Sequence, residues 1–375
     1  MTTQKRVVHI TTVHHPTDPR IFHKQCKSLA KAGFDVYYIA KDDPAIKEQE
    51  LIHHIPIKKY RNRFSRMLFG PFDAYRKAKK LKAQIYVFHD PELMFIGSLL
   101  KKKQNTVIYD IHEDYVTSIL QKDYLPKFLR HIFASVYTLF EKLFIRKMEL
   151  SLAEKYYFNR YKRGQLVLNY PMINEKFLTK DRRSKPVERK LLYTGNVTID
   201  RGALIHAEIP KINDDVSVYF IGKCSEALAE QMYERAKGQE SRLHFEGIGR
   251  FVEKEVIDRY YLDSNWIAGI ALFPPTDHYK QKELTKFFEY MNAGLPIICS
   301  NFPVWKQFVE KYECGIAVDP YNPEEINEAI TFLLENPEKA YEMGENGKRA
   351  VVEQLNWHEE EKKLIAWYKE ILNNR

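Results

Sequence analysis

The chain has 375 residues, of which 44% are hydrophobic and 29% charged, a composition that suits two soluble domains with cores of their own. No apolar run is long enough for a transmembrane helix, the first residues carry no signal-peptide cleavage site, and the four cysteines follow no disulfide or zinc-site spacing, so we expect a cytoplasmic protein. The formal net charge of +9 favours an anionic partner: nucleic acid, a membrane surface or an anionic substrate.

The first predicted elements form a βαβ unit. A buried strand is predicted over residues 7–13, a helix that ends at Gly33 follows, and a second strand covers residues 35–40. Sheets of this kind bind ligands in the loops at the carboxyl ends of their strands. The loop over residues 14–20 is therefore a candidate binding segment, and Asp18 is also the predicted N-cap of the helix. The unit lacks Gly-x-Gly-x-x-Gly, so a dinucleotide site is not indicated.

Two later predicted strands, residues 85–88 and 106–109, each end in a histidine beside carboxylates. The residues that follow them are His89-Asp90 and Asp110-Ile111-His112-Glu113. A single histidine at a strand end is more often structural than catalytic, but two such tips on successive strands of one sheet converge on one edge. We predict that His112 is catalytic and that Asp110 or Glu113 orients it.

Cations and aromatic side chains cluster in two segments of the first half. Residues 51–72 contain no acid, and the cations among them are Lys58, Lys59, Arg61, Arg63 and Arg66. A helix is predicted from Pro126 to about Leu150, with an apolar face and basic flanks. It is either an ordinary core-packing helix with a solvated basic side or, together with the acid-free stretch, a surface that contacts an anionic membrane. Nucleic acid is not expected as a partner, because no binding motif accompanies the charge.

A highly charged segment, residues 174–189, indicates a hinge, and we place the domain boundary near residue 180. The strand that follows, residues 190–194, runs into a turn that contains Gly195 and ends at Arg201. A strand, a glycine turn and a cation at a helix start are typical of phosphate binding.

Residues 285–298 read Thr-Lys-Phe-Phe-Glu-Tyr-Met-Asn-Ala-Gly-Leu-Pro-Ile-Ile, which predicts an amphipathic helix that ends at Gly294 and then a short buried strand. Lys286 and Glu289 are three positions apart and share a helix face. From spacing alone, a surface ion pair is the simplest interpretation. The same two groups could also offset phosphate charge and accept hydroxyl hydrogen bonds.

The pattern Lys-x-Phe-Glu-Tyr-Met-x-Ala-Gly-x-Pro-Ile closely resembles the donor-site signature of the family 4 retaining glycosyltransferases. The resemblance implies the α/β fold called GT-B, with two doubly wound Rossmann-like domains that face each other across a cleft. Residues 1–180 would form the acceptor-side domain and residues 181–355 the nucleotide-sugar-binding domain, while residues 356–375 would form a C-terminal helix that crosses back to the first domain. Many relatives have a Glu-x7-Glu pair whose second member corresponds to Glu289, and Gln281 stands where its first glutamate would be, while Asn196 stands where many have a second basic residue.

The resemblance also implies roles for individual residues. Lys286 would contact the donor diphosphate, and Glu289 the ribose hydroxyls. The residues expected to be catalytic are His112, Arg201 and Lys286. Those expected to bind the donor are Gly195, Asn196, Arg201, Ile248, Arg250, Lys286, Phe288 and Glu289. Those expected on the acceptor side are His15, Asp18, Arg20, His89, Asp90 and Glu113.

The implied reaction is a retaining transfer of a sugar, with a UDP-sugar the expected donor, to a glycan or polyprenyl-linked acceptor in cell-surface polysaccharide synthesis. No Asp-x-Asp motif occurs, so we expect neither a metal nor another cofactor. The expected location is the cytoplasm, with peripheral attachment to the inner face of the membrane through Lys58, Lys59, Arg61, Arg63 and Arg66. The alternatives are a sugar-nucleotide epimerase of the same fold and a non-catalytic subunit of a polysaccharide-assembly complex.

Overall fold

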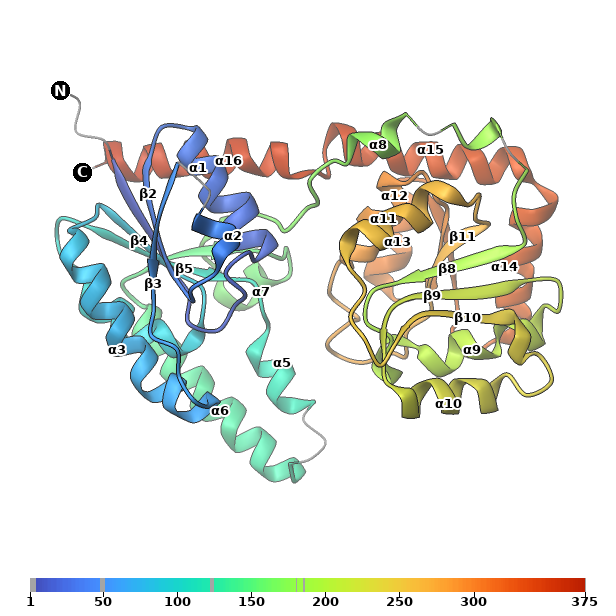
Figure 1. Cartoon of the computed structure of the whole chain (residues 1–375), viewed down its shortest axis with the longest axis horizontal. Coiled ribbons are helices and arrows are strands. Elements are labelled where there is room, and N and C mark those ends of the chain that lie inside the picture. The colour runs from blue at the N-terminus through green and yellow to red at the C-terminus, as the bar shows by residue number, and fades with distance from the viewer. Residues whose placement is uncertain (1–4, 48–50, 122–124, 180, 185, 375) are drawn as a thin grey trace. The chain divides into compact units, whose positions relative to one another are not determined.

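The structure is a computed structural model that describes residues 5–47, 51–121, 125–179, 181–184 and 186–374. The chain divides into two compact units (Figure 1). Unit 1 comprises Met1–Asn169 and Trp357–Arg375, and unit 2 comprises Tyr170–Asn356. The division after Asn169 precedes the boundary predicted near residue 180, and the C-terminal helix groups with unit 1. Among the described residues, no helix is long and apolar enough to span a membrane.

Unit 1 is built on a parallel sheet of seven strands in the order β3-β2-β1-β4-β5-β6-β7. The strands are β1 Arg6–Ile10, β2 Asp35–Ala40, β3 Ile52–Pro56, β4 Ile85–Phe88, β5 Thr106–Ile111, β6 Glu149–Leu152 and β7 Gln165–Leu166. Strand β1 ends earlier than the predicted residue 13, because the backbone amides of Thr12 and Val13 turn to the carboxylate of Asp90. The chain therefore leaves the sheet at the point where a site can form.

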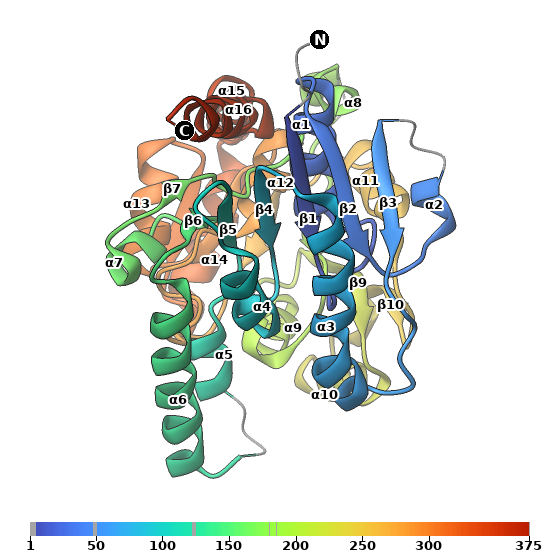
Figure 2. The same ribbon diagram turned by 90° about the vertical axis from the view of Figure 1, so that its left-hand side faces the viewer.

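Helices cover both faces of this sheet. They are η1 Pro19–Cys26 (a π-helix), α1 Lys27–Lys31, α2 Pro44–Lys47, α3 Arg63–Leu81, η2 Pro91–Leu93 (3-10), α4 Met94–Leu100, α5 Tyr115–Leu120, α6 Lys127–Ile145, α7 Tyr157–Tyr161 and α16 Trp357–Asn373. One core packs side chains of α3, α4 and α6 against the sheet, and a second packs those of η1, α1 and α16 against it. Figure 2 shows α3, α4 and α6 together.

The prediction that the helix after Pro126 reaches Leu150 is wrong. Helix α6 ends at Ile145, and Leu150 lies in β6, where it is fully buried and pairs with Tyr109 of β5. The apolar periodicity continues across the break, because a buried strand follows the helix directly.

Unit 2 is built on a parallel sheet of six strands in the order β10-β9-β8-β11-β12-β13. The strands are β8 Lys190–Thr194, β9 Ser217–Cys224, β10 Leu243–Ile248, β11 Ala268–Ala271, β12 Ile297–Ser300 and β13 Gly315–Val318. The helical segments are α8 Glu175–Leu178, η3 Arg182–Ser184, η4 Ile199–Arg201, α9 Ala203–Ile212, α10 Glu226–Arg235, η5 Glu240–Arg242, α11 Lys254–Asp263, α12 Thr285–Asn292, α13 Pro303–Lys311, α14 Pro323–Glu335 and α15 Pro337–Glu353.

Each sheet is doubly wound, and the strand order reverses between β1 and β4 in unit 1 and between β8 and β11 in unit 2. In open parallel sheets, ligands bind outside the carboxyl ends of the strands at this reversal. The topology therefore points to one position in each unit.

Candidate functional site

At the reversal in unit 2, a pocket of about 240 Å³ gathers residues from the loop after β8, the loop after β11 and the start of α12. Its lining residues are Thr194, Gly195, Arg201, Phe273, His278, Tyr279, Lys282, Glu283, Leu284, Thr285, Lys286 and Glu289. Four residues predicted from sequence to bind a donor meet here: Gly195, Arg201, Lys286 and Glu289.

Lys286 is buried, with 8% of the residue exposed, so its interpretation as a surface ion pair is wrong. Its Nζ donates to the carbonyl oxygen of Thr194 and lies 4.1 Å from the ring centroid of Tyr193. Burial and the charge of Arg201 lower the pKa of Lys286 to about 7, although Glu289 opposes the shift. A buried ammonium whose contacts among the described residues are a carbonyl oxygen and an aromatic ring gains strongly from an anion.

Arg201 stands at the same pocket and is held by a tyrosine that the sequence did not single out. Arg201 Nε donates to Tyr279 Oη at 3.1 Å, and Tyr279 Oη donates to Asp200 Oδ2 at 3.0 Å. Tyr279 comes from the loop after β11, so tertiary contact fixes the arginine. No local pattern marks Tyr279, nor Glu283, which also lines the pocket close to the exposed Gln281.

Gly195 provides the close approach that the pocket requires. Its φ is +86°, and a Cβ there would lie 3.1 Å from Lys286 Nζ. At Gly222 a Cβ would meet the carbonyl oxygen of Gly195 at 2.0 Å. A larger residue at Gly222 would displace the backbone of Gly195, and one at Gly195 would be strained at its positive φ and would crowd the ammonium.

The other four residues predicted to bind a donor lie outside this pocket. Phe288 is buried in the core, where its ring packs against Tyr170 and Phe308, because two positions along a helix separate it from the face of Lys286. Asn196 is exposed. The remaining two are Ile248 and Arg250, exposed at the end of β10, where Arg250 pairs with Glu246.

At the reversal in unit 1, a buried polar network surrounds Asp110. Its carboxylate accepts two hydrogen bonds from Arg20 (Nε–Oδ2 3.0 Å, Nη2–Oδ1 2.6 Å) and others from Gln25, Ser151 and His89. Burial disfavours the charged carboxylate, but Arg20 and the histidines outweigh it, so the pKa of Asp110 is well below its usual range. Asp110 is therefore a fixed anion.

Four histidines extend from this anion in two directions. His89 Nδ1 donates to Asp110 at 3.0 Å, so His89 Nε2 accepts from His9 Nδ1, also at 3.0 Å. On the other side, His112 Nδ1 lies 3.4 Å from Asp110 Oδ2, and His112 Nε2 lies 3.0 Å from His14 Nε2. Burial opposes the charged form of His112, but Asp110 prevails and raises its pKa.

A second carboxylate, that of Asp90, lies beside His14 at the other end of this row of histidines. His14 Nε2 lies 3.2 Å from Asp90 Oδ1, while Asp90 Oδ2 accepts hydrogen bonds from Thr11, Thr12 and Val13. The side chains of His14 and His112 are 13% and 10% exposed, whereas Asp90 and Asp110 are 0% exposed. A substrate can therefore reach the two histidines but not the carboxylates that hold them.

Most of the residues predicted on the acceptor side are either buried in this network or exposed outside it. Arg20, His89 and Asp90 are buried and support the network, so they cannot contact an acceptor directly. Asp18 caps η1 as predicted, and it lies 3.7 Å from His14 Nδ1. His15 and Glu113 are exposed and outside the network, so Asp110, not Glu113, orients His112. His14 was not predicted as a site residue, yet it is His14 and not the predicted His15 that contacts His112.

Among the described residues, His89, Asp110 and His112 place ligand atoms within 4.8 Å of one another, as a metal site would. The guanidinium of Arg20 already occupies both oxygens of Asp110, however, and the Nδ1 atoms of both histidines point to the same carboxylate. A further cation would meet repulsion from Arg20, so the geometry favours a hydrogen-bonded network.

Comparison with known proteins agrees with this architecture. The model of the family described as "Glycosyl transferases group 1" matches residues 206–350, which include α12 and much of the unit 2 pocket. A comparison with curated protein sequences finds no significant match.

Solved structures similar to the whole chain are glycosyltransferases of low sequence identity. Sucrose-phosphate synthase from Thermosynechococcus elongatus has a TM-score of 0.76 and 16% identity over 99% of this chain and 100% of its own. WaaG, a glycosyltransferase involved in lipopolysaccharide biosynthesis, has a TM-score of 0.66 and 14% identity over 96% and 98%. Anabaena HepE in complex with UDP-glucose has a TM-score of 0.68 and 12% identity over 97% and 99%. The chain therefore has the two-domain α/β GT-B fold of these enzymes.

Proposed function

We propose that the protein is a retaining glycosyltransferase that takes a sugar from a UDP-sugar. The observation that carries the proposal is the unit 2 pocket, where a buried lysine and an arginine meet a helix start and a glycine turn. This arrangement suits a diphosphate, and Glu289 on the same helix suits the two hydroxyls of a ribose. The HepE structures with UDP and with UDP-glucose support UDP as the nucleotide.

In the proposed reaction, the bond between the anomeric carbon and the diphosphate oxygen breaks while the acceptor hydroxyl attacks from the same face. The acceptor proton passes to the departing phosphate oxygen. Lys286 and Arg201 stabilise the charge that develops on the diphosphate, and preorganised charge of this kind contributes on the order of 3 kcal/mol per group. In unit 1, His112 and His14 orient the acceptor, and in unit 2, Glu283 supplies a carboxylate for hydroxyls of the donor sugar. No metal takes part.

The test is to incubate the full chain with UDP-, GDP- and ADP-sugars and to measure slow hydrolysis, with and without EDTA. We expect release of UDP that survives EDTA and that Lys286→Met abolishes. An epimerase would convert the UDP-sugar without releasing UDP, and a non-catalytic subunit would bind UDP without turnover, so either result would refute the proposal.

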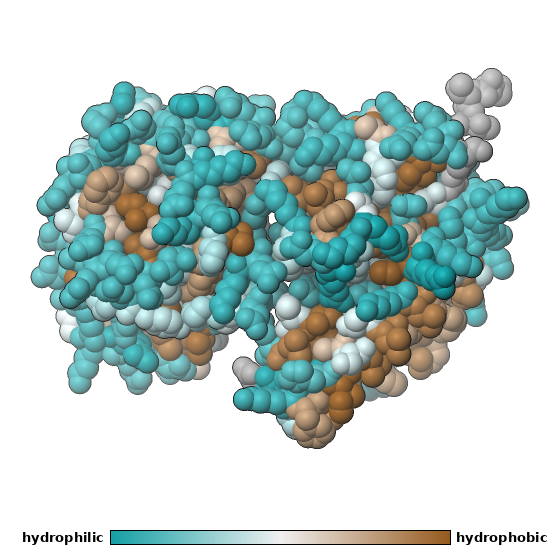
Figure 3. Space-filling model, turned by 180° about the vertical axis from the view of Figure 1, so that it is seen from behind, coloured by the Kyte–Doolittle hydropathy of each residue, from teal (hydrophilic) through white to brown (hydrophobic). Residues whose placement is uncertain are grey.

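We also propose that the protein works at an anionic membrane surface on a glycan or lipid-linked acceptor of cell-surface polysaccharide. In α6, Phe128, Val136, Leu139 and Leu143 are 61–72% exposed, and cations flank them. Exposed apolar side chains continue on α4, which packs beside α6, and on α3, which packs beside α4. Figure 3 shows them as a brown band along the lower edge of unit 1. Helix α6 contributes to the core through Ile145, but an ordinary core-packing helix would also bury the apolar face that is exposed here.

A further inference from the structure

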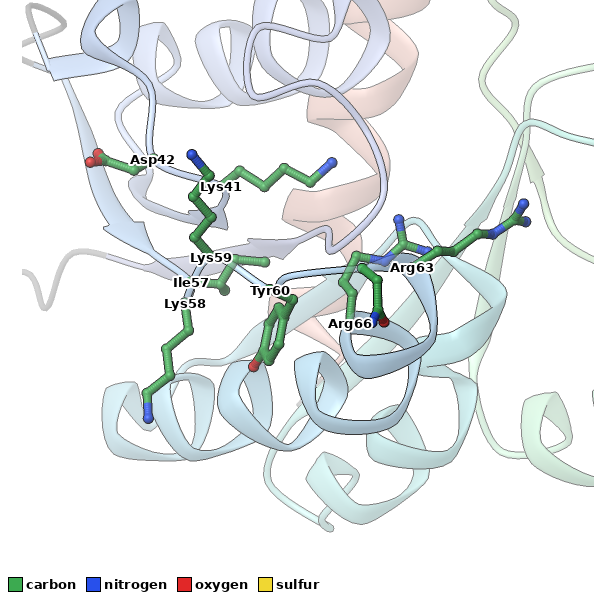
Figure 4. Close-up of a pocket in the computed structure, with 9 residues that line it drawn as sticks. Lys41, Asp42, Ile57, Lys58, Lys59, Tyr60, Arg63 and Arg66 are labelled. Carbon is green, nitrogen blue, oxygen red and sulfur yellow. The ribbon is translucent and has the colours of Figure 1, made fainter.

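A second pocket, of about 560 Å³, lies in unit 1 at the carboxyl ends of β2 and β3, where the first turn of α3 closes it (Figure 4). Its lining residues are Lys41, Asp42, Ile57, Lys58, Lys59, Tyr60, Asn62, Arg63 and Arg66. Four of these cations, Lys58, Lys59, Arg63 and Arg66, were predicted from sequence to contact a membrane surface. The structure arranges them around a cavity together with Lys41, whereas Arg61 is not among the lining residues.

The pocket holds more positive charge than its own residues neutralise. Five cations line it beside a single carboxylate, Asp42, which points away from Arg63 in Figure 4. Within the described parts of the chain, Lys59 and Arg63 have no ion-pair partner. Burial, followed by the charge of Arg66, lowers the pKa of Lys41.

Arg66 is a lining residue whose hydrogen-bonding capacity is not fully used. Its Nη2 donates to Glu92 Oε2 at 3.2 Å, but its Nε is buried and finds no acceptor among the described residues. A buried unsatisfied donor costs free energy that an anion in the pocket would recover. Helix α3, capped by Asn62, adds the positive end of its dipole at the same place.

Two contacts join this pocket to the histidine network on the same sheet edge. Lys41 Nζ donates to the carbonyl oxygen of Val13 at 2.7 Å, next to His14. Glu92, the partner of Arg66, accepts from Thr12 Oγ1 at 2.6 Å, and Thr12 also contacts Asp90. A ligand anchored in the pocket would therefore have its other end near the histidines that a substrate can reach.

We infer that this pocket binds a phosphate or diphosphate group of the acceptor, so that the enzyme acts on a phosphorylated sugar or a lipid-diphosphate-linked sugar. This part of the inference rests on the proposed glycosyltransferase function, whereas anion binding by the pocket does not. Arginine forks and lysines match the several oxygens and the double charge of phosphate. The apolar side chains of Tyr60 and Ile57 offer a surface for the sugar or prenyl portion.

The first experiment measures binding of inorganic diphosphate by calorimetry. The full chain carries Lys286→Met, which removes the main anion-binding group of the unit 2 pocket. We expect one remaining site. Arg63→Gln or Lys59→Gln should weaken it about tenfold each, because each removes one charge-assisted hydrogen bond to the anion. Lys80→Gln removes an exposed cation at the other end of α3 and should change nothing. Equal weakening by all three variants would show non-specific charge attraction and overturn the inference.

The second experiment identifies the source of the phosphate. Glucose 6-phosphate, geranyl diphosphate and glucose are compared as ligands, and vesicles of anionic phospholipid as competitors. Tighter binding of either phosphorylated compound than of glucose supports the inference and says whether the acceptor is a free sugar phosphate or a prenyl diphosphate. Binding of vesicles alone, lost equally in Arg63→Gln, would return these cations to the membrane surface and refute it. A UDP titration of the wild type tests the proposed function separately, because that site is in unit 2.

Discussion

The low pKa of Lys286 predicts that nucleotide binding takes up a proton. Without ligand the pKa is about 7, so at pH 8 roughly nine-tenths of Lys286 is neutral. A bound diphosphate would restore the ammonium and raise this pKa by several units. Binding of UDP at pH 8 should therefore consume about 0.9 proton per site, and UDP affinity should fall about fiftyfold between pH 7 and pH 9.

Calorimetry in buffers with different ionisation enthalpies measures this proton uptake directly, and UDP itself is fully ionised at pH 8. Lys286→Arg is the matched control, because its guanidinium stays charged throughout the range and should make UDP affinity nearly constant from pH 7 to 9. Uptake near zero at pH 8 in the wild type, or the same pH slope in both proteins, would show that Lys286 does not meet the diphosphate.

The remaining predictions concern stability, the two catalytic regions and the membrane. Since the folded-state pKa of Lys286 lies below the unfolded value of 10.5, the unfolded chain binds more protons between pH 7 and 10.5, so stability rises with pH there. Lys286→Met should thus raise the unfolding temperature at pH 7, a gain on the order of a few kcal/mol; an unchanged or lower temperature would contradict the burial cost. Glu289→Ala should weaken UDP binding about tenfold or more in calorimetry, and intact affinity would remove Glu289 from the ribose site. His112→Ala should lower transfer about a hundredfold while UDP affinity, measured in parallel, stays the same; an equal fall in both would make His112 a donor-binding group. Leu139→Ser should weaken co-sedimentation with anionic vesicles roughly tenfold, whereas Phe158→Ser, an exposed aromatic on α7, should not, and neutral vesicles should bind neither.

Much of the fold follows from local pattern. Strands β2, β4 and β8 have the predicted bounds, since each is an apolar run with clear ends. The bounds that differ depend on distant partners. Strand β1 ends before Thr12 and Val13, whose backbone amides donate to the carboxylate of Asp90, a residue distant in sequence. Helix α6 ends before the segment that forms β6, which pairs with β5. Local periodicity cannot predict either contact, because the partners are distant in sequence.

The sites were predictable in residue type but not in environment. The spacing of Lys286 and Glu289 places both on one helix face. The burial of Lys286, however, depends on contacts with Tyr193 and Thr194, the last two residues of β8, which are distant from Lys286 in sequence. His14 and His15 are indistinguishable by sequence, and only the turn toward Asp90 brings His14 to His112.

The arrangement of the cations in the unit 1 pocket was also not predictable from the sequence, and it affects the functional interpretation. In sequence its cations are an acid-free stretch, for which a flat basic surface is the simplest expectation. In the structure, Lys41 joins them from the neighbouring strand end, and the orphaned Nε of Arg66 faces the interior of the protein and not bulk solvent. A lipid bilayer can neutralise cations on a surface, but a buried donor is satisfied only by a group that enters the pocket. Arg66, which lines the pocket and has a buried donor, is therefore the cation that best distinguishes acceptor binding from membrane attachment.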